Sequence, residues 1–282
     1  MKAAFAGWRK RERLVYGDAG RMTYIIVFII ITGLYGYLFG QPFLAILADA
    51  RENITYDMWP SADRAFAIAE HHFSDQYPSA YNIDRAADFF RETERRDPGL
   101  KYVHHELARI AFLKGDFTTA MAEINLQIAQ EGDSTPNSYY VRGLIEGFAG
   151  NYGDAAKDYE YFLQFEPRNW AGINDYAWVL LKASRSRDAV KTTAQGLVDF
   201  PDNAWLLNSN AIALYEVGDR VLAKVQAQKA LVAVGDLTER EWSLSYPGND
   251  PKSATEGLAA FKKATINNMS VIIGTSSRSA VQ

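Results

Sequence analysis

One small residue recurs along this chain at an almost constant interval. The spacings are 34, 35, 34 and 34 residues, and the members are Ala86, Ala120, Ala155, Ala189 and Ala223. A second column lies four residues after each alanine and comprises Phe90, Ile124, Tyr159, Thr193 and Ala227, of which Thr193 is polar. A third column marks the end of each interval with Pro98, Gly132, Pro167, Pro201 and Gly235. Three columns in register predict an array of repeated units that bury their apolar faces against one another.

Each repeated unit has the pattern of a helical hairpin. Two stretches of about 14 residues with helical periodicity are separated by a short turn. Gly115, Gly150 and Gly218 occupy the turn in three of the units, and Ser184 occupies it in another. The alanine column would let the two helices of a unit approach closely, while the larger residues beside it fill the seam to the next unit. The units are therefore predicted to be helix-turn-helix repeats.

These columns resemble the tetratricopeptide repeat (TPR), which has a period of 34 residues. The unit that fits best carries Gly143, Gly150-Asn151-Tyr152, Ala155, Tyr159 and Pro167. The resemblance implies an all-α fold, a right-handed α-solenoid of about five TPR-like helical hairpins with a capping helix. The expected units are residues 62–98, 101–132, 136–167, 170–201 and 204–235.

Two segments depart from the repeat pattern. Residues 77–82 replace the glycine turn of the first unit, so a longer loop is expected there. After the repeats, residues 236–269 are expected to form a capping segment with a helix at 253–268, and residues 270–282 a tail. The stretch from Trp242 to Pro251 contains two prolines and a glycine, so a regular first helix is not expected in it.

The N-terminal segment predicts a single transmembrane helix. Residues 1–21 carry six basic and two acidic residues, and residues 22–40 carry no charge. As a helix the uncharged stretch would span roughly 29 Å, the thickness of a bilayer core. We expect a membrane helix over 22–48, which kinks or surfaces at Pro42, and a linker over 49–61. The alternative is a signal peptide cleaved near Ala48-Asp49-Ala50, although the apolar stretch is longer than usual for one.

The distribution of charge predicts the orientation of this helix across the membrane. The basic residues 1–21 would remain cytoplasmic by the positive-inside rule, and the repeats would lie on the extracytoplasmic side. We therefore expect a single-pass protein of the bacterial inner membrane that contacts lipid through residues 22–48. Gly36 and Gly40 form a GxxxG pattern, which would allow close helix packing and a helix-helix dimer.

The sequence contains no pattern that indicates catalysis. It has no cysteine, no phosphate-binding glycine loop and no nucleophile elbow, so we expect neither an enzyme nor a bound cofactor. A net charge of −4 argues against a nucleic-acid partner. The four histidines form two adjacent pairs, and His71 and His105 are 34 residues apart. A metal or pH-sensitive site is one interpretation of these pairs, but ordinary polar residues lining a groove are the interpretation we favour, and we predict no metal.

The resemblance implies that a protein partner binds in the groove formed by the first helices. One register position of those helices holds His71, His105, Tyr140, Asn174 and Asn208. About one turn away lie Tyr102, Arg109, Trp178 and Trp205. Amide groups can donate to and accept from a peptide backbone, and aromatic rings give large rigid contacts.

Two functions agree with this pattern. The first is a membrane-anchored TPR scaffold that mediates protein-protein interaction as an accessory subunit of a membrane complex. The second is a TPR chaperone or assembly factor that binds extended client polypeptides near a translocon or envelope machine.

Overall fold

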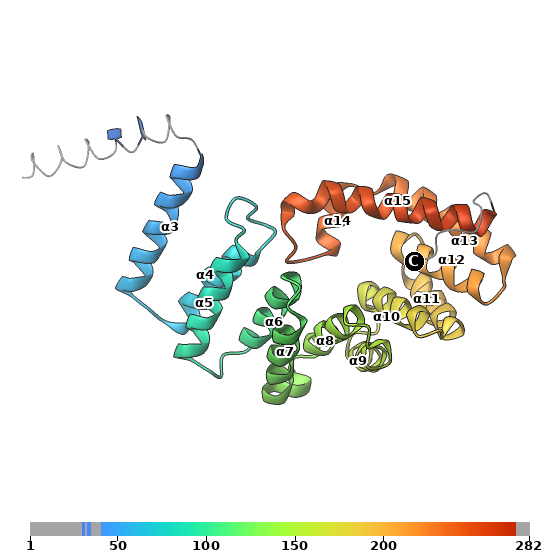
Figure 1. Ribbon diagram of the computed structural model, residues 1–282, viewed down its shortest axis with the longest axis horizontal. Helices are drawn as coiled ribbons and strands as arrows, with labels where there is room; N and C mark the ends of the chain where they lie inside the picture. Colours follow the sequence, from blue (N-terminus) through green and yellow to red (C-terminus); the bar gives the residue numbers. More distant parts are fainter. Residues whose placement is uncertain (1–29, 32, 35–40, 275–282) are drawn as a thin grey trace, which may run out of the picture. The chain divides into compact units, whose positions relative to one another are not determined.

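The computed structural model describes residues 30, 31, 33, 34 and 41–274, and in this part of the chain all regular structure is helical (Figure 1). The predicted all-α fold is confirmed. The chain divides into two compact units, Met1–Pro60 and Ser61–Gln282. We describe each unit separately.

In the first unit, helix α3 runs over Gln41–Met58. Pro42 lies in its first turn, where a proline is tolerated because the amide hydrogen has no helical partner. The helix passes residue 48 and continues through most of the segment expected to be a linker. Among the helices of the described residues, none is long and apolar enough to cross a membrane. Most of the expected span, including Gly36 and Gly40, lies outside these residues.

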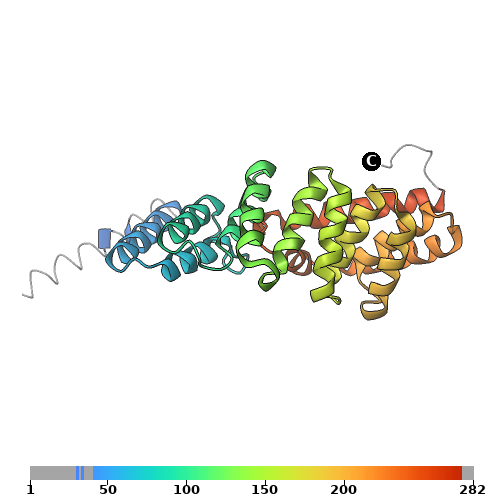
Figure 2. The same cartoon turned by 90° about the horizontal axis from the view of Figure 1, so that it is seen from below.

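In the second unit, five helical hairpins follow one another in chain order (Figure 2). The first helices are α4 (Ala62–Phe73), α6 (Val103–Leu113), α8 (Asn137–Phe148), α10 (Trp170–Lys182) and α12 (Ala204–Glu216). The second helices are α5 (Ile83–Arg96), α7 (Phe117–Glu131), α9 (Tyr152–Phe165), α11 (Ser186–Asp199) and α13 (Arg220–Asp236). A short 3-10 helix, η1 (Gly132–Ser134), occupies the polar insertion between the second and third hairpins.

The hairpin turns depend on left-handed backbone conformations. Gly150 and Gly218 have φ angles of 87° and 90°, which a glycine adopts at little steric cost. Ser184 occupies the same position in the fourth hairpin with φ 59°, although it has a side chain. The next helix is then capped in two hairpins by an aspartate, since Asp116 and Asp219 accept backbone N–H groups of the first turn. These local signals mark the ends of the first helices in the third, fourth and fifth hairpins, and the starts of the second helices α7 and α13.

The alanine column lies in the core of the repeats. All five alanines have an exposed fraction of 0%. The residues four positions later are also buried, and the polar member satisfies its hydroxyl within the core. Thr193 donates to the Ala189 carbonyl at 2.7 Å and accepts from Asn210 Nδ2 at 2.8 Å. A polar residue is tolerated in this column because both its hydrogen bonds are made.

The C-terminal segment contains α14 (Glu239–Ser245), the 3-10 helix η2 (Pro251–Ser253) and α15 (Ala254–Ile273). Helix α15 ends five residues later than the expected capping helix, because Met269 and Ile272 are buried in one apolar cluster with Ala211, Ala223 and Ala227. Helix α14 forms where the prolines and the glycine argued against a regular helix, since it ends at Ser245, before Pro247. Helix α14 begins at a capping box formed by Thr238 and Glu241.

We predict that replacing Ala155 with leucine will overpack the third hairpin. The added atoms have no free space, since Ala155 lies in a cluster with Tyr159, Ala177 and Leu180. The expected loss in the free energy of unfolding is about 1–3 kcal/mol. At about 2–4 °C per kcal/mol, thermal unfolding followed by circular dichroism should detect it. Ala129→Leu, at an exposed position of α7, is the matched control. Equal melting temperatures for the two variants would contradict the packing assignment.

Candidate partner-binding face

The side of the repeats that carries Arg109 of α6 and Trp205 of α12 contacts the C-terminal segment of the same unit, which follows the last hairpin (Figure 1). We call this surface the inner face. Its residues form three groups. The first group makes hydrogen bonds between neighbouring repeats, the second packs against neighbouring side chains of the repeats, and the third contacts the C-terminal segment.

Two predicted groove residues belong to a hydrogen-bonded row across three repeats. Tyr140 on α8 donates to Asp175 Oδ2 on α10 at 2.7 Å. Asn174 donates to the other carboxylate oxygen of Asp175 at 3.2 Å, and Ser209 on α12 donates to Asn174 Oδ1 at 2.8 Å. Burial raises the pKa of Asp175 to about 6, while its hydrogen bonds from Tyr140 and Asn174 oppose that shift. The amide of Asn174 therefore holds adjacent repeats in register in this structure.

The two equivalent histidines have different surroundings. His71 is half-buried, with its ring 4.5 Å from the ring of Tyr77. His105 is buried, and its Nδ1 lies 3.1 Å from Ser138 Oγ on α8. Burial, with the nearby Arg109 charge, lowers the pKa of His105 to about 3. Among the described residues, no group of three or more His, Cys, Asp or Glu side chains could hold a metal ion.

Three further predicted residues pack against protein neighbours. Trp178 lies between Phe148 and Tyr152, with ring centroids 5.3 and 6.2 Å away. Tyr102, which has a left-handed φ of 70°, meets His105 edge-on at 5.5 Å. Asn208 accepts from Asn268 of α15 at 3.0 Å. The capping helix thus already uses the last member of the predicted column.

The remaining two predicted residues, Arg109 and Trp205, contact the segment between α14 and α15. Trp205 Nε1 donates to the Tyr246 hydroxyl at 2.9 Å, and its ring stacks on Phe261 at 5.0 Å with an interplanar angle of 10°. Arg109 Nη2 donates to the Pro247 carbonyl at 2.8 Å. These contacts join the second and fifth hairpins to one short segment.

That segment, Tyr246–Asp250, is here called the closing loop. Tyr246 accepts the Asn249 amide at 3.2 Å, Pro247 follows it, and Gly248 has φ 89°, which is the pattern of a type II turn. The Gly248 carbonyl accepts from the Tyr81 hydroxyl at 2.7 Å. The turn is predictable from Tyr-Pro-Gly-Asn, but its docking on Tyr81 and Phe73 has no signal in the sequence, because repeat periodicity reports only neighbouring units.

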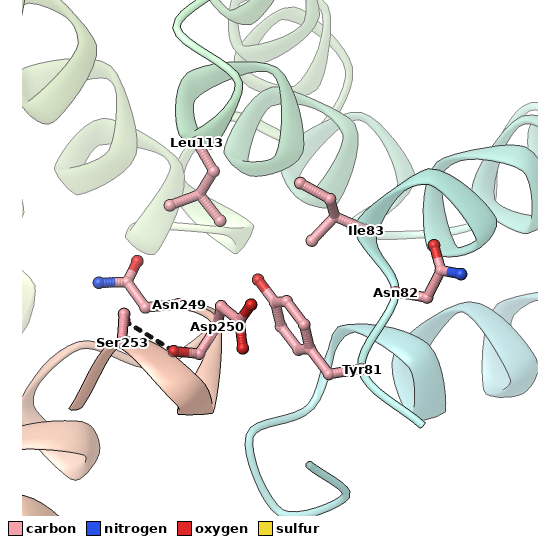
Figure 3. Close-up of a pocket in the computed structure, with 7 residues that line it drawn as sticks. All are labelled: Tyr81, Asn82, Ile83, Leu113, Asn249, Asp250 and Ser253. Atoms are coloured by element: carbon pink, nitrogen blue, oxygen red, sulfur yellow. Dashed lines mark hydrogen bonds between the residues drawn. The ribbon is translucent and has the colours of Figure 1, made fainter. Parts of the chain in front are cut away.

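A pocket of about 460 Å³ lies beside the closing loop (Figure 3). It is lined on the repeat side by Tyr81, Asn82, Ile83 and Leu113, and on the other side by Asn249, Asp250 and Ser253. Figure 3 shows the Tyr81 ring and the Asp250 side chain next to each other, with Leu113 and Ile83 across the space. Contact between the loop and the first two hairpins is therefore incomplete at this edge.

Arg109 is positioned by the buried side chain of Glu106 and by an aromatic ring. Its Nη1 donates to Glu106 Oε2 at 2.6 Å, and its guanidinium lies 4.8 Å from the centroid of Phe73. Burial raises the pKa of Glu106 to about 7; Arg109 opposes this shift and Glu70 adds to it. Because the guanidinium is held from two sides, its remaining donors point toward the loop carbonyl.

Solved structures with this fold are known, whereas no protein-family model and no curated protein matches the chain. The TPR protein YrrB, whose structure has an unusual peptide-binding site, superposes with a TM-score of 0.53 at 12% identity, covering 66% of this chain and 93% of YrrB. PilF of Pseudomonas aeruginosa gives 0.54 at 17% identity, covering 76% and 95%. MamA gives 0.52 at 15% identity, covering 62% and 98%. These similarities confirm the predicted TPR-like fold.

We predict that the raised pKa of Glu106 makes stability depend on pH. The folded state keeps this proton up to about pH 7, whereas the ordinary value is 4.5, so its contribution to stability is complete at acidic pH and is lost as the pH rises through 7. Glu106→Gln removes this titration. The melting temperature of the wild type minus that of the variant should therefore fall by a few degrees between about pH 5 and pH 8.

The control for this measurement is Glu160→Gln, at an exposed position of α9. It should leave the pH profile of the melting temperature unchanged. A constant difference between wild type and Glu106→Gln across the range would contradict the prediction.

Proposed function

We propose that this chain is a protein-interaction scaffold whose inner face binds a segment of a partner polypeptide. The observation that carries this proposal is the seating of the closing loop. Tyr81 and Arg109 donate to two successive main-chain carbonyls of that loop. Main-chain carbonyls occur in every polypeptide, so the same donors suit a segment of another protein. YrrB, a TPR protein with a peptide-binding site, supports the proposal by fold analogy.

The scaffold, in this proposal, is held at a membrane by residues 22–48. The support is the uncharged stretch at 22–40 and the basic segment before it. A tether of this kind confines the repeats near membrane-bound partners and raises their effective concentration. The proposed role is that of an accessory subunit of a membrane complex on the extracytoplasmic side of a bacterial inner membrane. The proposal assigns no catalytic reaction to the chain.

A second candidate is a chaperone or assembly factor for extended polypeptides. It agrees with the same pair of contacts in one respect, because both bonds are made to main-chain carbonyls and neither is made to a side chain of the loop. Purification in mild detergent separates the two candidates. One stoichiometric companion favours the complex subunit, whereas many substoichiometric clients favour the chaperone.

We predict that a photo-crosslinking residue on the inner face will capture the partner. Replacing Tyr102 or Tyr246 by p-benzoylphenylalanine retains an aromatic ring at each site, and both positions are at least partly exposed. Irradiation of membranes from the source bacterium should give one discrete adduct from both positions. Phe117 and Phe165, exposed on the second helices α7 and α9, are the matched controls. Adducts that form only at the control positions would refute binding at the inner face.

We predict that the repeats are reached by protease from outside the cytoplasm. In intact spheroplasts, added protease should cleave the chain after residue 50 and leave a small N-terminal fragment in the membrane. A cytoplasmic marker protein must stay intact in the same sample. Complete protection of the repeats until the spheroplasts are lysed would overturn the proposed orientation.

A further inference from the structure

The closing loop has the features of a bound ligand. Its type II turn presents the carbonyls of Pro247 and Gly248 to Arg109 and Tyr81. Gly248 is buried, and a Cβ there would lie 2.5 Å from Arg109 Nη2 and 3.2 Å from Phe73. We call Phe73, Tyr81 and Arg109 the loop-binding site. This site requires a turn with glycine at its third position, both for the left-handed φ and for the close approach.

The structure holds the cap in place without the closing loop. Trp242, which precedes the loop in the chain, and Leu258, which follows it, share an apolar cluster with Ala204 and Val234 of the fifth hairpin. Met269 and Ile272 attach α15 to α12 and α13 further along. Both ends of the loop are therefore fixed by contacts with the fifth hairpin. Release of the loop from the first two hairpins would leave these clusters intact.

The loop is held to the first two hairpins by few bonds, while Tyr246 also accepts from Trp205 of the fifth hairpin. Its bonds to the loop-binding site are one from a tyrosine and one from an arginine, each made to a main-chain carbonyl. Tyr246 is 37% exposed, Asp250 is exposed, and the pocket beside Tyr81 leaves part of the seam unfilled. A partner that offers two carbonyls in the same turn would replace these bonds one for one, so the net change in hydrogen bonding is small.

We propose that the closing loop occupies the docking site of a partner segment with a Pro-Gly turn, preceded by an aromatic residue that takes the place of Tyr246 beside Trp205, and that this partner binds by displacing the loop. The inference deepens the proposed scaffold function and rests on it. In the wild type, the tethered loop competes at high effective concentration, so a free turn peptide binds poorly. A partner with additional contacts, or one confined to the same membrane, would overcome that competition.

The test uses the full chain in mild detergent and a labelled cyclic peptide of the sequence Ser-Tyr-Pro-Gly-Asn-Asp, which copies residues 245–250. Cyclisation holds the turn and reduces the entropy lost on binding. The variant is Tyr246→Ala/Gly248→Ala, which changes the loop and leaves the loop-binding site intact. Hydrogen exchange should show the Asn249 amide exchanging at least tenfold faster in the variant, with the hairpins unchanged. Fluorescence anisotropy should show the peptide binding at least tenfold more tightly to the variant than to the wild type.

Two controls isolate the cause. Gly218→Ala carries the same left-handed strain, with φ 90° and no neighbour within 4 Å, so it should leave the loop closed. The cyclic peptide with alanine in place of glycine should not bind the opened variant. A loop that stays closed in the double variant, a peptide that binds neither protein, or one that binds both proteins equally would each overturn the inference.

Failure of this inference is distinguishable from failure of the scaffold proposal. If Tyr102 crosslinks a partner while the double variant neither opens nor binds the cyclic peptide, the scaffold stands and the displacement mechanism is wrong. If partner adducts form only at the outer control positions, the scaffold proposal itself is wrong.

Discussion

The close approach of two helices at an alanine is the constraint on which the repeat unit depends. The five alanines of the column are fully buried, and each lies near the start of the second helix of its hairpin. A methyl side chain leaves the facing helix room to approach, and the residue four positions later fills the space beside it. No hairpin could bury this face alone, so the units stabilise one another in sequence. Stacking of the hairpins aligns the five first helices on the same side, and the inner face results from this alignment.

The sequence was sufficient to predict the all-helical fold, since the signals for it are local and repeated. Three columns in register, with glycine at the turns, predict helical hairpins without any knowledge of distant contacts. Within the described residues, the two departures in the helices after the repeats have different causes. Helix α14 begins at a capping box, which is a local signal, whereas α15 continues because Met269 and Ile272 are buried against α12 and α13, which is a long-range contact. Gly36 and Gly40, on which the membrane dimer prediction depends, lie outside the described residues, and that prediction stays untested.

The candidate site was predictable only in part. Periodicity identified Arg109 and Trp205 as residues of the first helices, and both contact the closing loop. It could not identify Tyr81, which lies in the irregular loop of the first hairpin. It also could not show that the amide of Asn174 joins two repeats and is not free to bind a partner. The contacts of Tyr81 and Asn174 depend on which chain segment comes to lie opposite them. A repeat pattern carries no information about a partner 167 residues away, as Tyr81 and Gly248 are.

That separation bears on the order in which the molecule acquires its structure. Hairpins form through nearby contacts and can assemble as the ribosome releases them, whereas the bond between Tyr81 and Gly248 closes a loop of 167 residues and must wait for both ends. The nascent chain therefore displays an uncovered inner face for as long as its last segment is unfinished. A product truncated before Gly248 would lack the bond from Tyr81, and this part of its inner face would stay uncovered.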